Sequence, residues 1–100
     1  MKKYSLYKDS LTQYHLSGVV NFFSAADIVS SGYQLFTCTQ QVVLSLRNID
    51  GFDSSIVSVL LSWQRFCNKN NIKFAISCAD DKLAKLLQSY HVKDLFDYFD

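Results

Sequence analysis

The first part of the chain alternates between apolar and polar side chains, which is the pattern of half-buried β-strands. Residues 3–8 alternate with a period of two, and residues 13–19 do the same, with Gly18 bending or ending the second segment. The two segments are separated by a short polar stretch that contains Asp9 and Ser10. A connection of this kind predicts an antiparallel hairpin.

Helical and strand-like patterns follow one another after the hairpin. Ser24 and Asp27 form a capping-box pattern, which predicts a helix that is weakened by Gly32 in its interior. A β-branched apolar run, an amphipathic helix, an alternating strand that ends at Cys78 and a last helix come next. The predicted order is strand 3–8, strand 13–19, helix 24–35, strand 42–46, helix from 53 or 54 to 68, strand 72–78 and helix 81–90, with the apolar tail at 94–99 left unassigned.

This order predicts an α/β fold. A hairpin followed by βαβ units gives a mixed sheet of four or five strands with right-handed crossovers and three or four helices. The alternation in several strands indicates that one face of the sheet is less covered than the other. A chain of 100 residues is expected to form one domain, spanning residues 1–100.

Composition narrows the classes of function. A hydrophobic content of 49% with 19% charged residues excludes a disordered chain. A formal net charge of +1 argues against a strongly electrostatic nucleic-acid binder. The apolar runs are too short to span a membrane. The three cysteines have no CxxC spacing, which indicates reduced thiols in a cytoplasmic protein rather than a disulfide framework or a zinc site.

The sequence contains no recognisable catalytic constellation. His15 and His91 are not spaced from a cysteine or a carboxylate in the manner of a triad or a metal site. The three glycines form no phosphate-binding loop. We therefore expect no enzymatic activity, no cofactor and no metal.

The passage from strand to helix at residues 42–55 carries the strongest local signal. Asp53 and Ser54 open the predicted helix, where a capping side chain contributes about 1 kcal/mol. Ser54 either serves only as a cap, or also presents its hydroxyl at the positive end of the helix. A phosphate attached there would be stabilised by the helix dipole and would change the local surface charge.

The outer flank of the same helix is a candidate partner surface. At about 100° per residue, Val57 and Leu61 point well away from the apolar side that faces the core. The flank is either part of an interface or an ordinary case of scattered exposed apolar residues. The pair Phe22 and Phe23, expected in a loop, has the same two interpretations. The residues predicted to share the outer flank with Val57 and Leu61 are Ser54, Ser58 and Arg65.

Five segments together resemble the STAS domain family, the fold of anti-sigma factor antagonists. The resemblance covers essentially the whole chain. Within the family, the length and these motifs are most similar to the small stand-alone, MlaB-like STAS subunit of the Mla phospholipid transporter. The segments are Leu16-Ser17-Gly18, Val43-Leu44-Ser45-Leu46, Asp53-Ser54-Ser55, Asn70-Asn71-Ile72-Lys73-Phe74 and Asp81-Lys82-Leu83-Ala84-Lys85-Leu86-Leu87.

The resemblance implies a non-enzymatic protein that binds the cytoplasmic ATPase of an Mla-type phospholipid-transporting ABC complex and regulates or stabilises it. The alternative is an anti-sigma factor antagonist that a partner kinase switches by phosphorylating Ser54. The family usually carries glycine soon after the Asp-Ser or Asp-Thr pair, where this chain has Ser55 and Ile56. The expected location is cytoplasmic, peripheral to the inner membrane through the partner. The expected partner-binding residues are Asp53, Ser54, Ser55, Val57, Ser58, Leu61, Arg65, Phe22 and Phe23.

Overall fold

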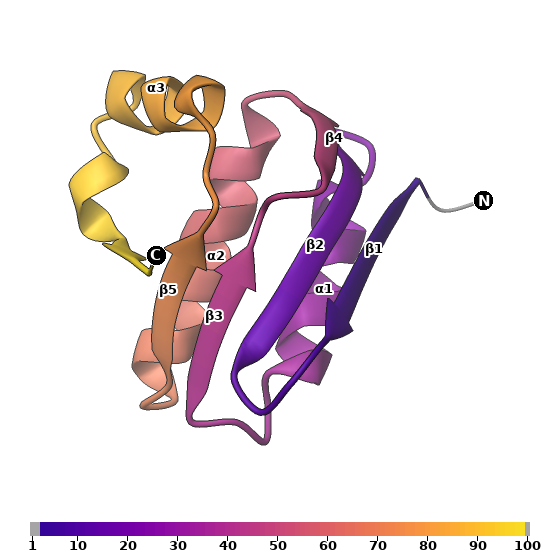
Figure 1. Ribbon diagram of the computed structural model, residues 1–100, viewed down its shortest axis with the longest axis vertical. Coiled ribbons are helices and arrows are strands. Elements are labelled where there is room, and N and C mark those ends of the chain that lie inside the picture. The colour runs from indigo at the N-terminus through magenta and orange to yellow at the C-terminus, as the bar shows by residue number, and fades with distance from the viewer. Residues whose placement is uncertain (1–2, 100) are drawn as a thin grey trace.

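A mixed β-sheet forms one layer of the fold, and helices α1 and α2 form a second layer behind it (Figure 1). The computed structural model describes residues 3–99. In chain order the elements are β1 Tyr4–Lys8, β2 Gln13–Val20, α1 Ala25–Leu35, β3 Gln41–Ser45, β4 Ile49–Phe52, α2 Ser55–Lys69, β5 Lys73–Ser77, α3 Asp81–Ser89, the 3₁₀ helix η1 Lys93–Leu95 and β6 Asp97–Tyr98.

The sheet has the strand order β1-β2-β3-β5-β6, and β4 pairs with the carboxyl-terminal part of β2. β1 and β2 form the expected antiparallel hairpin, with Leu6 opposite Leu16. The pairs β2–β3, β2–β4, β3–β5 and β5–β6 are parallel. The predicted α/β fold, a hairpin followed by βαβ units in a mixed sheet, is therefore confirmed.

The core lies between the sheet and the two helices. Tyr14 of β2, Leu44 of β3 and Ile76 of β5 each expose no more than 1% of their surface, and Trp63 of α2 is fully buried against them. Because side chains alternate along a strand, every second residue of β2, β3 and β5 points into this core. The same alternation explains why β2 and β5 are recognisable in the sequence, whereas β3 is recognised by its β-branched apolar run.

The opposite side of the sheet, here called the open face, carries Tyr7, His15, Val43, Ser45 and Ser77. No helix lies in front of β2 and β3 on this side (Figure 1). Val43 and Ser45 are nevertheless buried, whereas Tyr7 is exposed and His15 is partly exposed. The prediction that one sheet face is less covered than the other is therefore confirmed.

The contact between α1 and α2 depends on Gly32. A Cβ atom at this position would lie 2.2 Å from the Nε1 atom of Trp63. The indole Nε1–H of Trp63 donates a hydrogen bond to the Val29 carbonyl at 3.2 Å. The glycine that weakens α1 as an isolated helix is therefore required where α1 packs against Trp63.

The capping box predicted at the start of α1 is not formed. Ser24 occupies the N-cap position, but its side chain makes no capping hydrogen bond. Its hydroxyl oxygen accepts a hydrogen bond from the Asn21 N–H at 3.0 Å, inside the preceding turn. Asp27 accepts a hydrogen bond from the Tyr4 hydroxyl instead of reaching back to the cap. Both side chains are thus used by neighbouring segments, which a local pattern does not reveal.

Three further differences concern segments between or after the main elements. The sequence predicts a loop before α2, whereas residues 49–52 form β4 on the part of β2 that β3 leaves uncovered. This pairing uses backbone groups, so it needs no side-chain alternation. Cys78 does not end the strand as predicted, because it adopts a left-handed φ of 61° and is exposed. The unassigned tail forms η1 and β6 and buries Phe96.

Candidate functional site

Asp53 organises the amino-terminal end of α2. Its Oδ1 atom accepts a hydrogen bond from the Ser55 N–H at 2.9 Å and another from the Ser55 hydroxyl. Ser54 occupies the N-cap position and is exposed, but its side chain makes no capping hydrogen bond. The capping prediction for this pair is therefore confirmed for Asp53 and wrong for Ser54.

Hydrogen bonds also set the charge state of Asp53. The side-chain and backbone bonds from Ser55, with a weaker contribution from the Phe22 N–H, lower the pKa of Asp53 below its ordinary value of 3.8. Hydrogen bonds of this kind favour the charged form of a carboxyl group. Asp53 is therefore ionised at neutral pH and places a negative charge beside the exposed Ser54 hydroxyl.

The turn between β2 and α1 presents two phenylalanine rings to solvent. Phe22 is 70% exposed and Phe23 is 96% exposed, and their rings stack with centroids 5.8 Å apart. Asn21 Oδ1 accepts hydrogen bonds from the Phe23 N–H at 2.9 Å and from the Ser24 N–H at 3.1 Å. The turn is therefore held in a defined shape although its side chains are exposed.

Asp53 connects this turn to α2. Its second carboxylate oxygen, Oδ2, accepts a hydrogen bond from the Phe22 N–H at 3.1 Å. One carboxylate thus holds both the start of α2 and the turn that carries the phenylalanines. A shallow depression of about 500 Å³ lies between them. It is lined by Phe22, Asp53, Ser54, Ser55, Val57, Ser58 and Tyr90.

The prediction that Val57 points away from the core is wrong. Val57 is 5% exposed and belongs to the hydrophobic core, and Leu61 is partly buried against that core. The carboxyl-terminal segment reaches the same side of α2 farther along the helix, where Gln64, one turn beyond Leu61, donates a hydrogen bond to the Leu95 carbonyl at 2.6 Å. The helical wheel considers α2 alone, so it cannot include the neighbouring segments that bury Val57 in the folded protein.

The exposed stripe of α2 is polar. Ser54, Ser58 and Arg65 are exposed, as the helical wheel predicts. Arg65 is about 16 Å from Ser54 along the helix axis at 1.5 Å per residue, so it lies near the other end of α2. The structure therefore brings together a smaller set than the sequence predicted. We call this set the α2 N-terminal surface: Phe22, Phe23, Asp53, Ser54 and Ser58.

Two residues that the sequence analysis did not select also belong to the site. Asn21 shapes the turn through its side-chain hydrogen bonds. An asparagine three residues before a helix-starting serine is a recognisable turn signal, since its side chain can bond nearby backbone N–H groups. Tyr90 is 51% exposed and lines the depression. It lies three residues after the buried Leu87, and this helical spacing predicts an inward position. It lies at the C-cap of α3, where the helical spacing ends.

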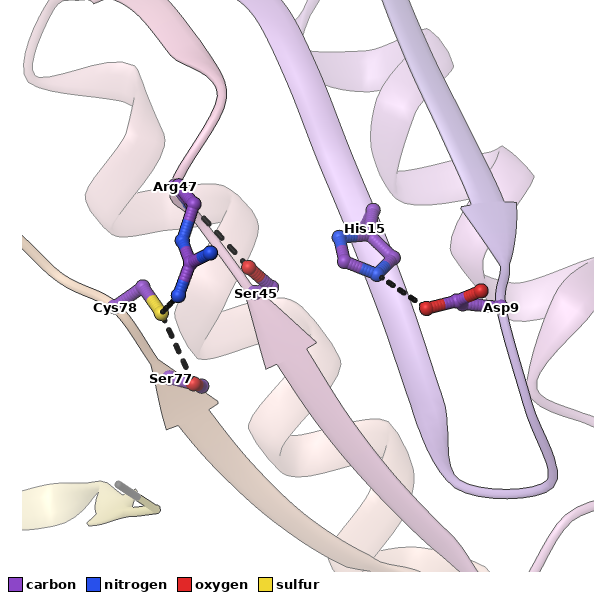
Figure 2. Close-up of polar contacts among 6 residues, drawn as sticks. All are labelled: Asp9, His15, Ser45, Arg47, Ser77 and Cys78. Atoms are coloured by element: carbon purple, nitrogen blue, oxygen red, sulfur yellow. Dashed lines mark hydrogen bonds and ion pairs between the residues drawn. The ribbon is translucent and has the colours of Figure 1, made fainter.

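Other reactive groups lie apart from this surface. On the open face, Cys78 Sγ lies 3.5 Å from the Arg47 Nη2 atom and 3.4 Å from the Ser77 hydroxyl (Figure 2). These contacts, with that of Ser77 the largest, lower the pKa of Cys78. Burial raises the pKa of Cys67 to about 11. Within residues 3–99, no group of three or more His, Cys, Asp or Glu side chains is placed to hold a metal ion.

None of the helices formed by the described residues is both long and apolar enough to cross a membrane. On the α2 N-terminal surface, the exposed apolar side chains are those of Phe22 and Phe23. The geometry of this surface is suited to contact with another macromolecule, because aromatic side chains supply large contact areas at interface centres.

Comparison with solved structures places the fold among known domains. SpoIIAA, an anti-sigma factor antagonist, matches in its unphosphorylated form with a TM-score of 0.75 and 11% identity over 97% of this chain and 88% of that chain. The phosphorylated form of SpoIIAA, a Bacillus cell-fate determinant, matches with a TM-score of 0.69 and 11% identity over 97% and 91% of the two chains. A sulfate transporter family protein from Wolinella succinogenes matches with a TM-score of 0.70 and 21% identity over 89% and 78%.

These structural matches share the fold at low sequence identity. No curated protein matches the chain in sequence. The model of the STAS domain family matches residues 6–100, which is nearly the full length of the chain. The protein therefore belongs to the STAS domain family.

Proposed function

We propose that this protein is a non-enzymatic binding module that docks on a partner protein through its α2 N-terminal surface. The observation that carries the proposal is the exposed, stacked pair Phe22 and Phe23, whose backbone N–H groups donate hydrogen bonds to the Asp53 and Asn21 side chains. Burying apolar surface stabilises a complex by about 25 cal/mol per Å², before the costs of association. A rigid turn loses little conformational entropy on binding, so it suits an interface anchor.

We infer that the partner is the cytoplasmic ATPase of an Mla-type phospholipid-transporting ABC complex. The resemblance of the chain's motifs to those of transporter STAS subunits supports this partner. A subunit that binds one conformation of an ATPase, or its assembled dimer, shifts the population toward that state by mass action. The protein would act in the cytoplasm, at the inner membrane, through this contact.

A variant of the exposed Phe23 tests the proposal, and a variant of the exposed Leu11 is the matched control. Phe23→Ser removes the most exposed ring of the docking surface, and Leu11→Ser removes an equally apolar side chain, 83% exposed, in the hairpin turn at the other end of β2. Both positions are solvent-exposed, so both variants are expected to fold. Each protein is purified, together with the proteins bound to it, from the cells in which it is produced. The bound proteins are identified by their peptides, and the ATPase activity of the complex is measured.

The proposal predicts that Phe23→Ser lowers recovery of the ATPase and permease about tenfold or more, as expected for an interface anchor. Leu11→Ser should leave recovery unchanged. Ser54→Arg should also weaken binding, because it buries a charge at the contact. Equal recovery with the wild type, Phe23→Ser and Leu11→Ser proteins would show that the docking surface lies elsewhere.

A second candidate function is an anti-sigma factor antagonist switched by phosphorylation of Ser54. The specific observation in its favour is that the Ser54 side chain is exposed and makes no capping hydrogen bond, so its hydroxyl is accessible. The α2 amino terminus would stabilise an added phosphate, while the neighbouring Asp53 carboxylate would oppose it. A phosphate would therefore add repulsion at the point where Asp53 holds the phenylalanine turn.

Intact-mass measurement separates the two functions. Incubation with a co-purified kinase and ATP should add one phosphate to the wild type and none to Ser54→Ala if the switch operates. Ser58→Ala, one turn farther along the same exposed stripe, is the control that should still be modified. Recovery of an ATPase and a permease without modification supports the transporter function instead.

A further inference from the structure

The outer edge of β1 is available for strand pairing. β1 is first in the strand order and has β2 on its other side, and no other strand within residues 3–99 pairs with its outer edge (Figure 1). The strand is five residues long, contains no proline and pairs with β2 in an unbroken register. Such an edge presents backbone donors and acceptors on which another strand can pair.

The hairpin determines which backbone groups of β1 face outward. The Val19 N–H donates to the Lys3 carbonyl at 2.9 Å, and the Asp9 N–H donates to the Gln13 carbonyl at 2.7 Å. Hydrogen-bonded pairs alternate along an antiparallel ladder, so the backbone groups of the odd-numbered residues from 3 to 9 face β2. The backbone groups of residues 4, 6 and 8 therefore face the outer edge.

We propose that a second copy of this chain pairs antiparallel with this edge, with the two-fold axis at Leu6. In this register Leu6 lies opposite Leu6 of the second copy, and Tyr4 lies opposite Lys8. Every outward-facing position then meets another outward-facing position, which gives about six interchain hydrogen bonds. Moving the two-fold axis to Ser5 or Tyr7 leaves about four interchain hydrogen bonds between the two copies of β1. The result is an isologous dimer with one continuous sheet.

Charge complementarity supports a second copy as the occupant. In the register centred on Leu6, Lys3 of each copy lies opposite Asp9 of the other, and the symmetry repeats this pair. Asp9 lies on the open face, where its Oδ2 atom is 3.1 Å from His15 Nε2 (Figure 2). Lys3 immediately precedes β1, and its carbonyl continues the ladder by accepting from the Val19 N–H, so extending the alternation of β1 by one residue assigns Lys3 to that same face. Opposite charges at facing cross-strand positions stabilise pairing, and like charges there oppose it.

Sedimentation equilibrium of the full chain over a wide concentration range tests the dimer. Lys3→Asp should raise the dimer dissociation constant about tenfold, since both symmetric pairs change from attraction to repulsion. Asp9→Lys should have a similar effect. The double variant Lys3→Asp/Asp9→Lys should restore the wild-type constant, because it exchanges the charges. Lys85→Asp on the exposed side of α3 makes the same charge change away from the edge and should have no effect.

Leu6→Pro supplies an independent test. The N–H of residue 6 faces outward, so proline removes an interchain donor without removing a hydrogen bond between β1 and β2. A circular dichroism spectrum like that of the wild type, together with loss of the dimer, supports the proposal. A wild-type protein that stays monomeric at every concentration overturns it. A dimer that the charge variants and Leu6→Pro leave unchanged, or that Lys85→Asp weakens equally, also overturns it.

Discussion

Replacing Gly32 by alanine sets two physical effects against each other. Alanine is favoured over glycine in a helix interior by about 1 kcal/mol, so α1 considered alone would become more stable. In the folded protein, the added Cβ would lie 2.2 Å from Nε1 and 2.4 Å from Cε2 of Trp63. The ring is fully buried and rigid, so it cannot move aside as a flexible side-chain end could.

The clash should outweigh the gain in helix propensity. Overpacking a core by one methyl group costs about 1–3 kcal/mol. Displacing the indole would also weaken its hydrogen bond to the Val29 carbonyl, and an unsatisfied buried donor costs about 1–3 kcal/mol. We therefore expect Gly32→Ala to lower the free energy of unfolding by about 2 kcal/mol. In a domain of this size that lowers Tm by about 10 °C.

Urea unfolding followed by circular dichroism measures this difference. Gly51→Ala is the matched control, because a Cβ at Gly51 meets nothing within 4 Å. Its free energy of unfolding should stay within about 0.5 kcal/mol of the wild type. In a Trp63→Phe background, the smaller ring should make the effect of Gly32→Ala much weaker. A rise in stability for Gly32→Ala in the wild-type background would refute the packing argument.

Three further predictions concern single side chains. Iodoacetamide should modify Cys78 faster than Cys67, because the lowered pKa of Cys78 increases its thiolate fraction. Arg47→Met should slow the reaction at Cys78, and peptide mass analysis measures both rates. Asp80→Ala should lower the free energy of unfolding by about 1 kcal/mol in a thermal melt, because the carboxylate caps α3 at 2.8 Å. The folded state lowers the pKa of Asp53, so its ionised form contributes stability above pH 3.8 that is lost as pH falls through the lowered pKa. The difference in unfolding free energy between wild type and Asp53→Asn should therefore shrink in that acid range, and a constant difference would contradict this explanation.

The candidate site was only partly predictable. Exposure of Ser54, Ser58 and Arg65 follows from the helical wheel, because the position of the apolar stripe fixes the opposite side of an amphipathic helix. The burial of Val57 does not follow from it, since burial beside the apolar stripe depends on neighbouring segments outside the helix. The bond from the Phe22 N–H to Asp53 joins residues 31 positions apart, and no local spacing predicts such a contact.

The sequence by itself determined the order of the main elements and the α/β class. Alternation in β2 and β5 and the helical spacing in α2 are local consequences of burying one side of each element. Only the tertiary structure decided which flanks are covered, that β4 adds to β2, and that Gly32 accommodates Trp63. Those features arise from contacts between segments distant in the chain, where the available space and the unpaired backbone groups, rather than the side-chain pattern, select the conformation.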